Sequence, residues 1–228
     1  MNKNDLEAEL EVWRDRQAFR CIHGHNGLTH GNCWKMAKGI KDKIGFFDIE
    51  TSDLNADWGF LLSYCIKYEG GGIIKRCITP KEVLNDKLRD HRLIKEFARD
   101  VLLFDTLVVY YGKDTGGRYQ RHDIPFMRTR FEFWRHKGFP KQKEMGIIDV
   151  YDVVKSKLKL KRNSMQYACN FLGIINKTTP HDFGVWQRAR DGNRAALRKI
   201  LKHNEEDVIT TEELYKRIYH YKKVKVLL

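Results

Sequence analysis

The stretch FFDIET at residues 46–51 decides the fold, because it joins a buried strand to a pair of acidic side chains. Side chains alternate between the two faces of a strand, so Asp48 and Glu50 are expected on one face. Phe47 and Ile49 then point into the core. Two carboxylates so placed repel one another unless a cation lies between them. The stretch is therefore a candidate cation site, and the alternative is an exposed acidic end of the strand.

The segments on either side of this stretch predict a sheet with helices. Runs of β-branched and aromatic residues indicate strands, and the Glu-Gly-Gly turn at residues 69–71 indicates a hairpin. The strands are expected at residues 44–49, 58–68, 72–79, 107–111 and 147–150. Helices are expected at residues 5–20, 81–101, 165–172 and 194–219, the third between Ser164 and Gly173. This order predicts an α/β fold with a mixed five-stranded sheet flanked by helices.

Two later segments carry acidic side chains of the same kind. Asp123 follows the predicted strand at residues 107–111 and its loop, and alone it is typical of a helix N-cap with Pro in the first turn. His203 and Asp207 are four residues apart, so they share one helix face and address one site. Alone, this pair is typical of a solvated helix face.

Together, the four acidic side chains form a candidate site for two divalent cations. Mg²⁺ takes oxygen ligands and keeps bound waters that are able to attack a substrate. Two ions about 3.5–4 Å apart stabilise both the attacking and the leaving oxygen of a phosphodiester displacement. His203 is placed to orient or deprotonate the attacking water. The four acids of this site are Asp48, Glu50, Asp123 and Asp207.

The order of these motifs resembles the DEDD (DnaQ-like) superfamily of 3′–5′ exonucleases, which has a ribonuclease H-like fold. The motifs are Asp48-x-Glu50, Asp123-Ile-Pro-Phe and His203-x-x-x-Asp207. They are similar in particular to predicted exonuclease domains related to the proofreading modules of family-B polymerases. The resemblance covers about residues 43–220 and implies hydrolysis of nucleic-acid phosphodiesters from a 3′ end. It also implies that the four acids bind two Mg²⁺ or Mn²⁺ ions and that His203 lies near the attacking water.

The histidine departs from the pattern of the family. One branch of the superfamily has Tyr four residues before the last acid, and the other has His five residues before it; His203 stands at the spacing of the Tyr branch. Either His203 still positions water, or activity is weakened and the fold serves as a nucleic-acid-binding module. A ribonuclease H-like endonuclease is the other alternative. His181 matches neither spacing, and Asp149 is expected to support the site rather than to bind the metal.

A second group of possible metal ligands precedes the first strand. Zinc takes thiolate and imidazole ligands in tetrahedral sets, and two Cys and three His fall within 13 residues. We expect Cys21, His30, Cys33 and either His23 or His25 as ligands, with His23 preferred. The zinc would hold together an N-terminal helical arm at residues 1–42, apart from the exonuclease domain at 43–228. The alternative is a polar loop whose Cys side chains pack under Trp34.

The charge of the chain indicates a polyanionic partner. Lys and Arg total 43 against 30 Asp and Glu, which gives a net charge of +13 and a pI of about 9.5. The run KSKLKLKR at residues 155–162 is the densest; each such run is alternatively a solvated face. The expected partner is DNA or RNA, as a single strand or a 3′ end, contacted with low sequence specificity. Candidate contacts are Lys113, Arg118, Arg121, Lys157 and Lys159.

The remaining patterns exclude some classes of protein. No stretch approaches the roughly 18 apolar residues of a membrane span, and the charged N-terminus does not resemble a signal peptide. Five scattered Cys make a poor disulfide framework, which predicts a reducing, cytoplasmic location. The sequence predicts no oligomeric state.

Overall fold

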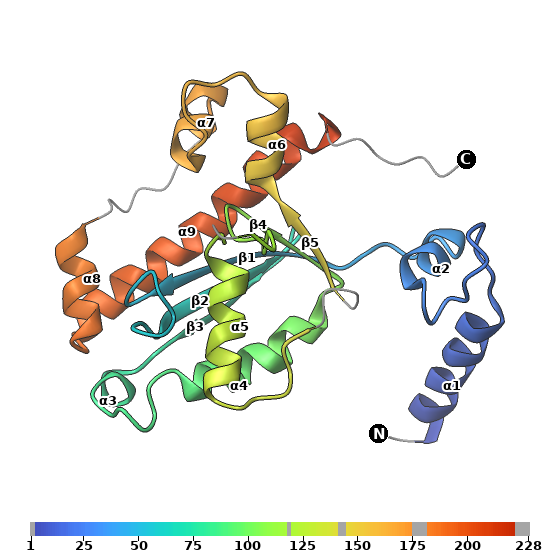
Figure 1. Cartoon of the computed structure of the whole chain (residues 1–228), viewed down its shortest axis with the longest axis horizontal. Helices are drawn as coiled ribbons and strands as arrows, with labels where there is room; N and C mark the ends of the chain where they lie inside the picture. The colour runs from blue at the N-terminus through green and yellow to red at the C-terminus, as the bar shows by residue number, and fades with distance from the viewer. Residues whose placement is uncertain (1–2, 118–119, 141–144, 175–181, 222–228) are drawn as a thin grey trace. The chain divides into compact units, whose positions relative to one another are not determined.

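The contacts of the chain divide it into two units, Met1–Asp42 and Lys43–Leu228. We describe each unit by itself. The computed structural model describes residues 3–117, 120–140, 145–174 and 182–221 (Figure 1). Within these ranges, no helix combines the length and the apolar character that crossing a membrane requires.

The second unit is built on a five-stranded sheet in the order β3-β2-β1-β4-β5. The neighbours β1–β2 and β2–β3 are antiparallel, whereas β1–β4 and β4–β5 are parallel. This arrangement confirms the predicted mixed sheet. The strands are β1 (Ile44–Thr51), β2 (Leu61–Tyr68), β3 (Ile73–Cys77), β4 (Thr106–Val109) and β5 (Gly146–Asp149).

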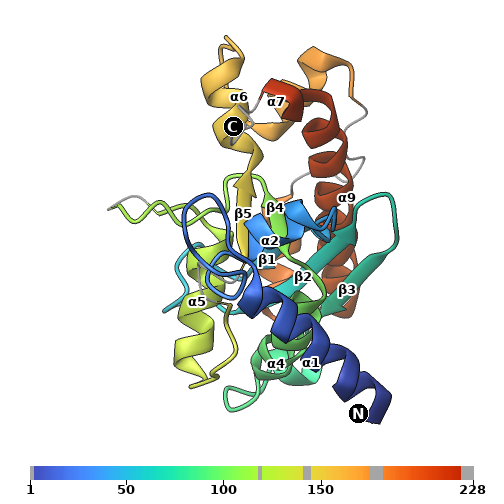
Figure 2. The same ribbon diagram turned by 90° about the vertical axis from the view of Figure 1, so that its right-hand side faces the viewer.

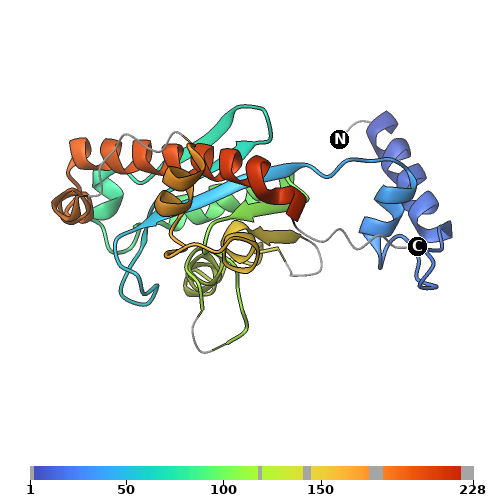
Figure 3. The same ribbon diagram turned by 90° about the horizontal axis from the view of Figure 1, so that it is seen from above.

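Helices cover both faces of this sheet, as the three views show (Figures 1, 2 and 3). One core, which contains Phe47, includes residues of α4, α5, α8 and the first half of α9. The other core, which contains Phe46, packs against α6, α7 and the second half of α9. The helices of this unit are α3 (Pro80–Val83), α4 (His91–Asp100), α5 (Asp123–Phe133), α6 (Val150–Lys157), α7 (Met165–Leu172), α8 (Phe183–Arg190) and α9 (Arg194–Ile218).

Strand β1 follows the predicted alternation of faces. Phe47 and Ile49 are buried in the core beneath α4 and α5, as expected. Asp48 and Glu50 therefore lie on the opposite face, which α9 crosses. A shift of register between Glu50 and Thr51 interrupts the pairing of β1 with β2 at this end of the strand. The acidic pair thus lies where the regular sheet ends.

The prediction of a single helix at residues 81–101 was wrong. The structure has two shorter helices, α3 and α4, and Leu84 and Leu88 of the expected apolar stripe are 74% and 47% exposed. The chain turns between them because Asp90 is fully buried and is bonded to other elements. Its carboxylate accepts hydrogen bonds from the Leu61 amide at 2.8 Å and from Arg130 at 2.8 Å. These tertiary bonds override the helical pattern.

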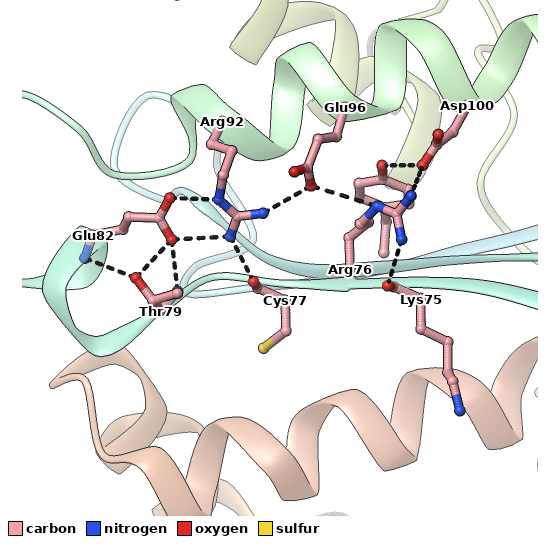
Figure 4. A network of polar contacts seen from close by, with 9 residues as sticks. Lys75, Arg76, Cys77, Thr79, Glu82, Arg92, Glu96 and Asp100 are labelled. Carbon is pink, nitrogen blue, oxygen red and sulfur yellow. Dashed lines mark hydrogen bonds and ion pairs between the residues drawn. The ribbon is translucent and has the colours of Figure 1, made fainter.

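Polar contacts attach the edge strand β3 to the helices on one face (Figure 4). The Arg92 guanidinium donates to Glu82 at 2.7 Å and to Glu96 at 2.8 Å. On β3, the Arg76 guanidinium pairs with Glu96 at 3.5 Å and with Asp100 at 3.2 Å. The network joins α3, α4 and β3, so α4 is held along the sheet at a fixed register.

A buried carboxylate attaches α9 to the other face. Glu212 is 2% exposed and accepts a hydrogen bond from the Gly70 amide at 2.8 Å. It also pairs with Lys67 of β2 at 2.8 Å and with Lys216 at 3.0 Å. Because Gly70 lies in the β2–β3 hairpin, these bonds fix where α9 crosses the sheet. The same helix carries His203 and Asp207, so their position over β1 depends on this attachment.

The first unit consists of α1 (Lys3–Ala18), a loop and α2 (Gly31–Ala37). Two hydrogen bonds attach its loop to the end of α1. The Gly27 N–H donates to the Arg16 carbonyl at 2.7 Å, and the Arg16 Nε–H donates to the Gly27 carbonyl at 3.1 Å. The Trp34 indole N–H donates to Asp15 at 2.7 Å, and the Arg16 guanidinium lies over the Trp34 ring. These contacts make a small helical arm.

We expect the stabilising effect of Glu212 to depend on pH. Burial alone would raise the pKa of Glu212, but hydrogen bonds from Lys67, the Gly70 amide and Lys216 hold it below its ordinary value of about 4.5. Because the pKa of Glu212 is lower in the folded state, its ionised carboxylate stabilises the fold at pH values above the ordinary pKa. This contribution is lost as the pH falls through the lowered pKa. Glu212→Gln should therefore lower the free energy of unfolding at neutral pH by about 1–3 kcal/mol.

Urea denaturation across a pH series measures this effect. The gap between wild type and Glu212→Gln should shrink as the pH falls below about 4.5. The exposed neighbour Glu213 is a matched control on the same helix, and Glu213→Gln should leave the urea midpoint nearly unchanged at every pH. If the difference in stability between wild type and Glu212→Gln stayed constant down to acid pH, the lowered pKa of Glu212 would be contradicted.

Candidate active site

The first carboxylate of the site is oriented by a neighbour on α9. Asn204 is fully buried, and its Nδ2 donates to Asp48 Oδ2 at 2.6 Å. The Ser63 hydroxyl of β2 donates in turn to Asn204 Oδ1 at 3.3 Å. Asp48 is thus held by a hydrogen-bonded path through α9 and β2. Asn204 was not among the predicted site residues, although it stands directly after His203 in the motif HNEEDV at residues 203–208.

Strand β1 and helix α9 bring three further ligand atoms together. His203 Nε2 lies 3.5 Å from Asp207 Oδ2 and 3.9 Å from Glu50 Oε1. One ligand atom from each of these residues lies within 4.8 Å of the other two. The spacing of four residues between His203 and Asp207 therefore does place both side chains at one site, and both are buried.

An aromatic side chain from α8 supports this group. Trp186 donates its indole N–H to Glu50 Oε2 at 3.1 Å. Its ring also packs edge-to-face against His203, with 5.1 Å between the ring centroids. Trp186 therefore orients both side chains. Trp186 was not among the predicted site residues because its short helix, α8, was not predicted from the sequence pattern.

Asp123 enters the site from α5, but not as a helix cap. The N-cap position belongs to His122, which makes no capping bond with its side chain, and the prediction that Asp123 caps this helix was wrong. Asp123 is instead the first residue of α5 and is only 4% exposed. Within the part of the chain that the structure describes, its Oδ2 is buried without a hydrogen-bond partner. A buried carboxylate oxygen of this kind suits a cation.

The other acids affect the charge of Asp123. Burial raises the pKa of Asp123 well above its ordinary value, and the nearby charges of Asp48, Asp149, Glu50 and Asp207 raise it further. Three elements carry the four acids that the sequence singled out: β1 carries Asp48 and Glu50, α5 carries Asp123, and α9 carries Asp207. Of these four, Glu50 and Asp207 are grouped with His203 within 4.8 Å.

Asp149 supports the site, as the sequence analysis expected. At the end of β5, its Oδ2 accepts hydrogen bonds from the Gly112 and Lys113 amides, each at 3.0 Å. The Arg121 guanidinium pairs with the same oxygen at 2.6 Å. The other oxygen accepts the amides of Tyr111 and Tyr151 at 2.9 and 3.0 Å. These bonds engage both oxygens of the Asp149 carboxylate and hold the loop that leads to α5.

That loop passes very close to Asp123. The Ile124 amide donates to the Gly112 carbonyl at 2.9 Å. A Cβ atom at Gly112 would collide with the Asp123 carboxylate, so a larger residue fits at this position only if Asp123 moves. On the other side, Thr51 Oγ1 lies 3.2 Å from His122 Nε2, which connects the end of β1 to the start of α5. The position of Asp123 is therefore fixed by backbone on one side and by β1 on the other.

The predicted cationic contacts have different surroundings. Lys113 donates its backbone amide to Asp149, and the Arg121 guanidinium pairs with Asp149 and Asp152. Lys157 ends α6 and Lys159 follows it, and both side chains are exposed. Arg118 lies outside the described part of the chain, as does His181, which was weighed against His203.

The donor set suits divalent cations. Four carboxylates supply the oxygen ligands that Mg²⁺ and Mn²⁺ take, and His203 adds one imidazole beside Glu50 and Asp207. A cation among these carboxylates would offset the repulsion around Asp123. The residues present therefore fit a divalent metal site at the carboxyl ends of the parallel strands, where open α/β sheets commonly bind ligands.

Comparison with known proteins gives a family and a fold. The sequence model described as the RNase_H superfamily matches residues 45–219. No curated protein matches the chain. The structure is similar to the family B DNA polymerase from the hyperthermophilic archaeon Pyrobaculum calidifontis, with a TM-score of 0.59 and 16% identity. This likeness covers 78% of the chain and 25% of the polymerase, so the chain spans about a quarter of that protein.

A second similar structure is Brucella melitensis NrnC. It is 14% identical, and the likeness covers 82% of this chain and 91% of NrnC at a TM-score of 0.37, from which we draw nothing further. The family match confirms the ribonuclease H-like superfamily that the sequence motifs indicated, and the structural likeness agrees with its fold.

We expect Gly112→Ala to disturb the metal site through Asp123. The added methyl group would occupy the space of Asp123 Oδ2 and displace the carboxylate. The affinity for Mn²⁺, measured by isothermal titration calorimetry, should fall by about 10–100-fold. Gly117→Ala is the matched control in the same loop, because its Cβ would meet only Thr115 Oγ1, at 3.9 Å. Equal affinities of the two variants would show that Asp123 does not take part in metal binding.

Proposed function

The chain belongs to the RNase_H superfamily, and we propose that it is a metal-dependent nuclease that removes nucleotides from 3′ ends by a two-metal mechanism. Membership of this superfamily supports a nuclease with a nucleic-acid substrate. The observation that carries the proposal is the group formed by Glu50, His203 and Asp207, whose ligand atoms lie within 4.8 Å of one another, together with the nearby buried carboxylate of Asp123. The similarity of the fold to a family B DNA polymerase agrees with it.

The four acids would hold the cations. Asp48, Glu50, Asp123 and Asp207 are the proposed ligands of two Mg²⁺ or Mn²⁺ ions. When bound, the ions would supply an activated water and neutralise charge on the leaving oxygen. Asn204 would keep Asp48 in one orientation, as its 2.6 Å hydrogen bond suggests.

His203 and Trp186 would prepare the attack. Hydrolysis forms a bond between the water oxygen and phosphorus and breaks the bond to the 3′ oxygen, so one proton leaves the water and one reaches the 3′ oxygen. His203 Nε2 faces Glu50 and Asp207, where it would orient the water or accept its proton. Trp186 would hold both His203 and Glu50 in place.

The substrate would be bound through its backbone. The net charge of +13 favours a polyanion, and the exposed Lys157 and Lys159 are proposed phosphate contacts. Phosphate contacts position a nucleic acid without specifying its sequence, so single strands of DNA or RNA with a free 3′ end are the proposed substrates. Arg121 would act mainly through its pairs with Asp149 and Asp152.

We predict that loss of one carboxylate abolishes hydrolysis. Asp48→Asn and Asp207→Asn should each lower kcat by at least about 10³-fold, because metal stabilisation is worth several kcal/mol and each 1.4 kcal/mol or so is a factor of ten. The assay follows the stepwise shortening of 5′-labelled single strands with Mg²⁺ or Mn²⁺. EDTA should stop the reaction, and added Mn²⁺ should restore it.

Controls separate this proposal from its alternatives. Glu213→Gln changes the same charge on an exposed face of α9 and should keep full activity. Cleavage of a circular single strand would show an endonuclease. Binding of the labelled strand without any shortening of it would indicate that the protein is a nucleic-acid-binding module. Full activity of Asp48→Asn or Asp207→Asn would overturn the site itself.

We predict a separate effect for His203. Removal of the imidazole in His203→Ala should lower kcat by about 10²–10⁴-fold with little change in KM, since the group acts on the water and not on the substrate. His203→Tyr should retain more activity than His203→Ala, because a phenol hydroxyl is also able to orient water. Circular dichroism checks that both variants fold. An unchanged kcat in His203→Ala would remove His203 from the mechanism.

A further inference from the structure

Four side chains of the first unit surround one point in space. Cys21 Sγ lies 3.6 Å from His23 Nδ1 and 3.6 Å from His30 Nδ1. Cys33 Sγ lies 3.9 Å from each of the same two nitrogens. All four atoms lie within 4.8 Å of one another. We infer that Cys21, His23, His30 and Cys33 bind one structural zinc ion, independently of the carboxylate site.

The distances are those of a single tetrahedral ion. Zinc–sulfur and zinc–nitrogen bonds of about 2.3 and 2.05 Å at a tetrahedral angle place sulfur and nitrogen about 3.6 Å apart. The four sulfur–nitrogen distances run from 3.6 to 3.9 Å. A binuclear iron–sulfur cluster would need its two pairs of ligands farther apart, since each pair binds a different iron. The donor set of two thiolates and two imidazoles is typical of zinc.

The backbone forms this arrangement from two short motifs. Residues 20–26 make a tight hairpin, closed by a bridge between Arg20 and Asn26 and by the bond from the Cys21 amide to the His25 carbonyl at 3.0 Å. Gly24, with φ of +77°, allows the turn that returns the chain, so that His25 and Asn26 lie beside Cys21 and Arg20. The hairpin therefore presents its Cys and His from one end.

The second motif is the start of a helix. His30 is the N-cap residue of α2, and Cys33 lies in the first turn of that helix. Asn26 closes the link between the two motifs, because its Oδ1 accepts from the amides of Leu28 and Thr29 at 3.1 and 3.0 Å. The hairpin supplies one Cys and one His, and the helix supplies the other pair.

The structure separates the two histidines that the sequence left as alternatives. His23 Nδ1 faces both sulfur atoms. The His25 ring instead packs against the His30 ring, with 4.0 Å between centroids. His25 therefore supports the orientation of His30 from outside the ligand set, and His23 is the fourth ligand.

The arm needs such an ion because it has almost no core. Among residues 6–31 and 33–42, whose exposure is described, only Gly27 and Trp34 are buried. A unit of this size buries too little apolar surface to fold by itself, and small domains commonly obtain the missing free energy from a metal. A zinc ion would join the hairpin to α2 and so complete the arm.

Metal analysis of the full-length chain tests the inference. Purified without chelators, the protein should carry one zinc per chain, measured by mass spectrometry of the metal. Replacement with Co²⁺ should give the visible spectrum of a tetrahedral site together with a sulfur-to-cobalt charge-transfer band. The carboxylate site contains no sulfur, so this band reports only on the arm. It should persist in Asp207→Asn.

Variants identify the ligands. Cys21→Ser, Cys33→Ser and His23→Ala should each lose the equivalent of zinc. Cys77→Ser and His25→Ala are the matched controls and should keep it, because Cys77 lies on β3 and His25 lies outside the ligand set.

Two results on the wild-type chain would overturn the inference, whether or not the variants fold. One is the absence of zinc together with a cobalt spectrum that has no charge-transfer band. The other is a disulfide between Cys21 and Cys33 in protein purified under reducing conditions, shown by an intact mass lower by two hydrogens and by peptide mapping. Loss of zinc in His25→Ala but not in His23→Ala would show that His25, and not His23, is the fourth ligand.

Discussion

Repulsion among carboxylates is the constraint on which the rest of the second unit depends. Asp123 is buried among acids that raise its pKa, so this cluster disfavours the charged state that a cation site needs. The fold must hold the acids together in spite of that repulsion. It does so with contacts that are individually ordinary: an amide on Asp48, an indole on Glu50 and four backbone amides on Asp149. Each fixes one acid, or the loop beside it, from an element other than its own.

The distant parts of the structure serve the same end. Glu212 fixes α9 against the β2–β3 hairpin, and α9 carries His203 and Asp207 to β1. On the opposite face, the network of Arg76 and Arg92 fixes α4 (Figure 4), and the buried pair of Asp90 and Arg130 connects α5 to the start of β2. Since α5 begins with Asp123, the acids are positioned from both faces of the sheet. Breaking a buried pair of this kind leaves an uncompensated charge, which makes the scaffold sensitive to single changes.

The predictable parts of this architecture are those that depend on local pattern. The period of two in β1 predicted which of Phe47 and Asp48 faces the core, and Ser164 and Gly173 marked the ends of α7. The pattern failed where a side chain serves a distant partner. Asp90 interrupts the helix expected at residues 81–101 because it binds Leu61 and Arg130, and Asp123 leaves the capping role for the acidic cluster. Gly112 and Trp186 contribute through contacts that span many residues, which no local spacing records.

The two proposed metal sites have different donor atoms, so each site selects a different kind of metal ion. The carboxylate site offers oxygen donors and one imidazole, which suit hard cations that retain water, and a catalytic site needs positions open to water and substrate. The arm offers two thiolates and two imidazoles that together complete a tetrahedron, which leaves no position for a substrate. Thiolates select zinc strongly over magnesium, so the arm would hold its ion at magnesium concentrations that load the carboxylates. The two ions of the carboxylate site would then act on the substrate, while the zinc ion would stabilise a segment that lacks a core of its own.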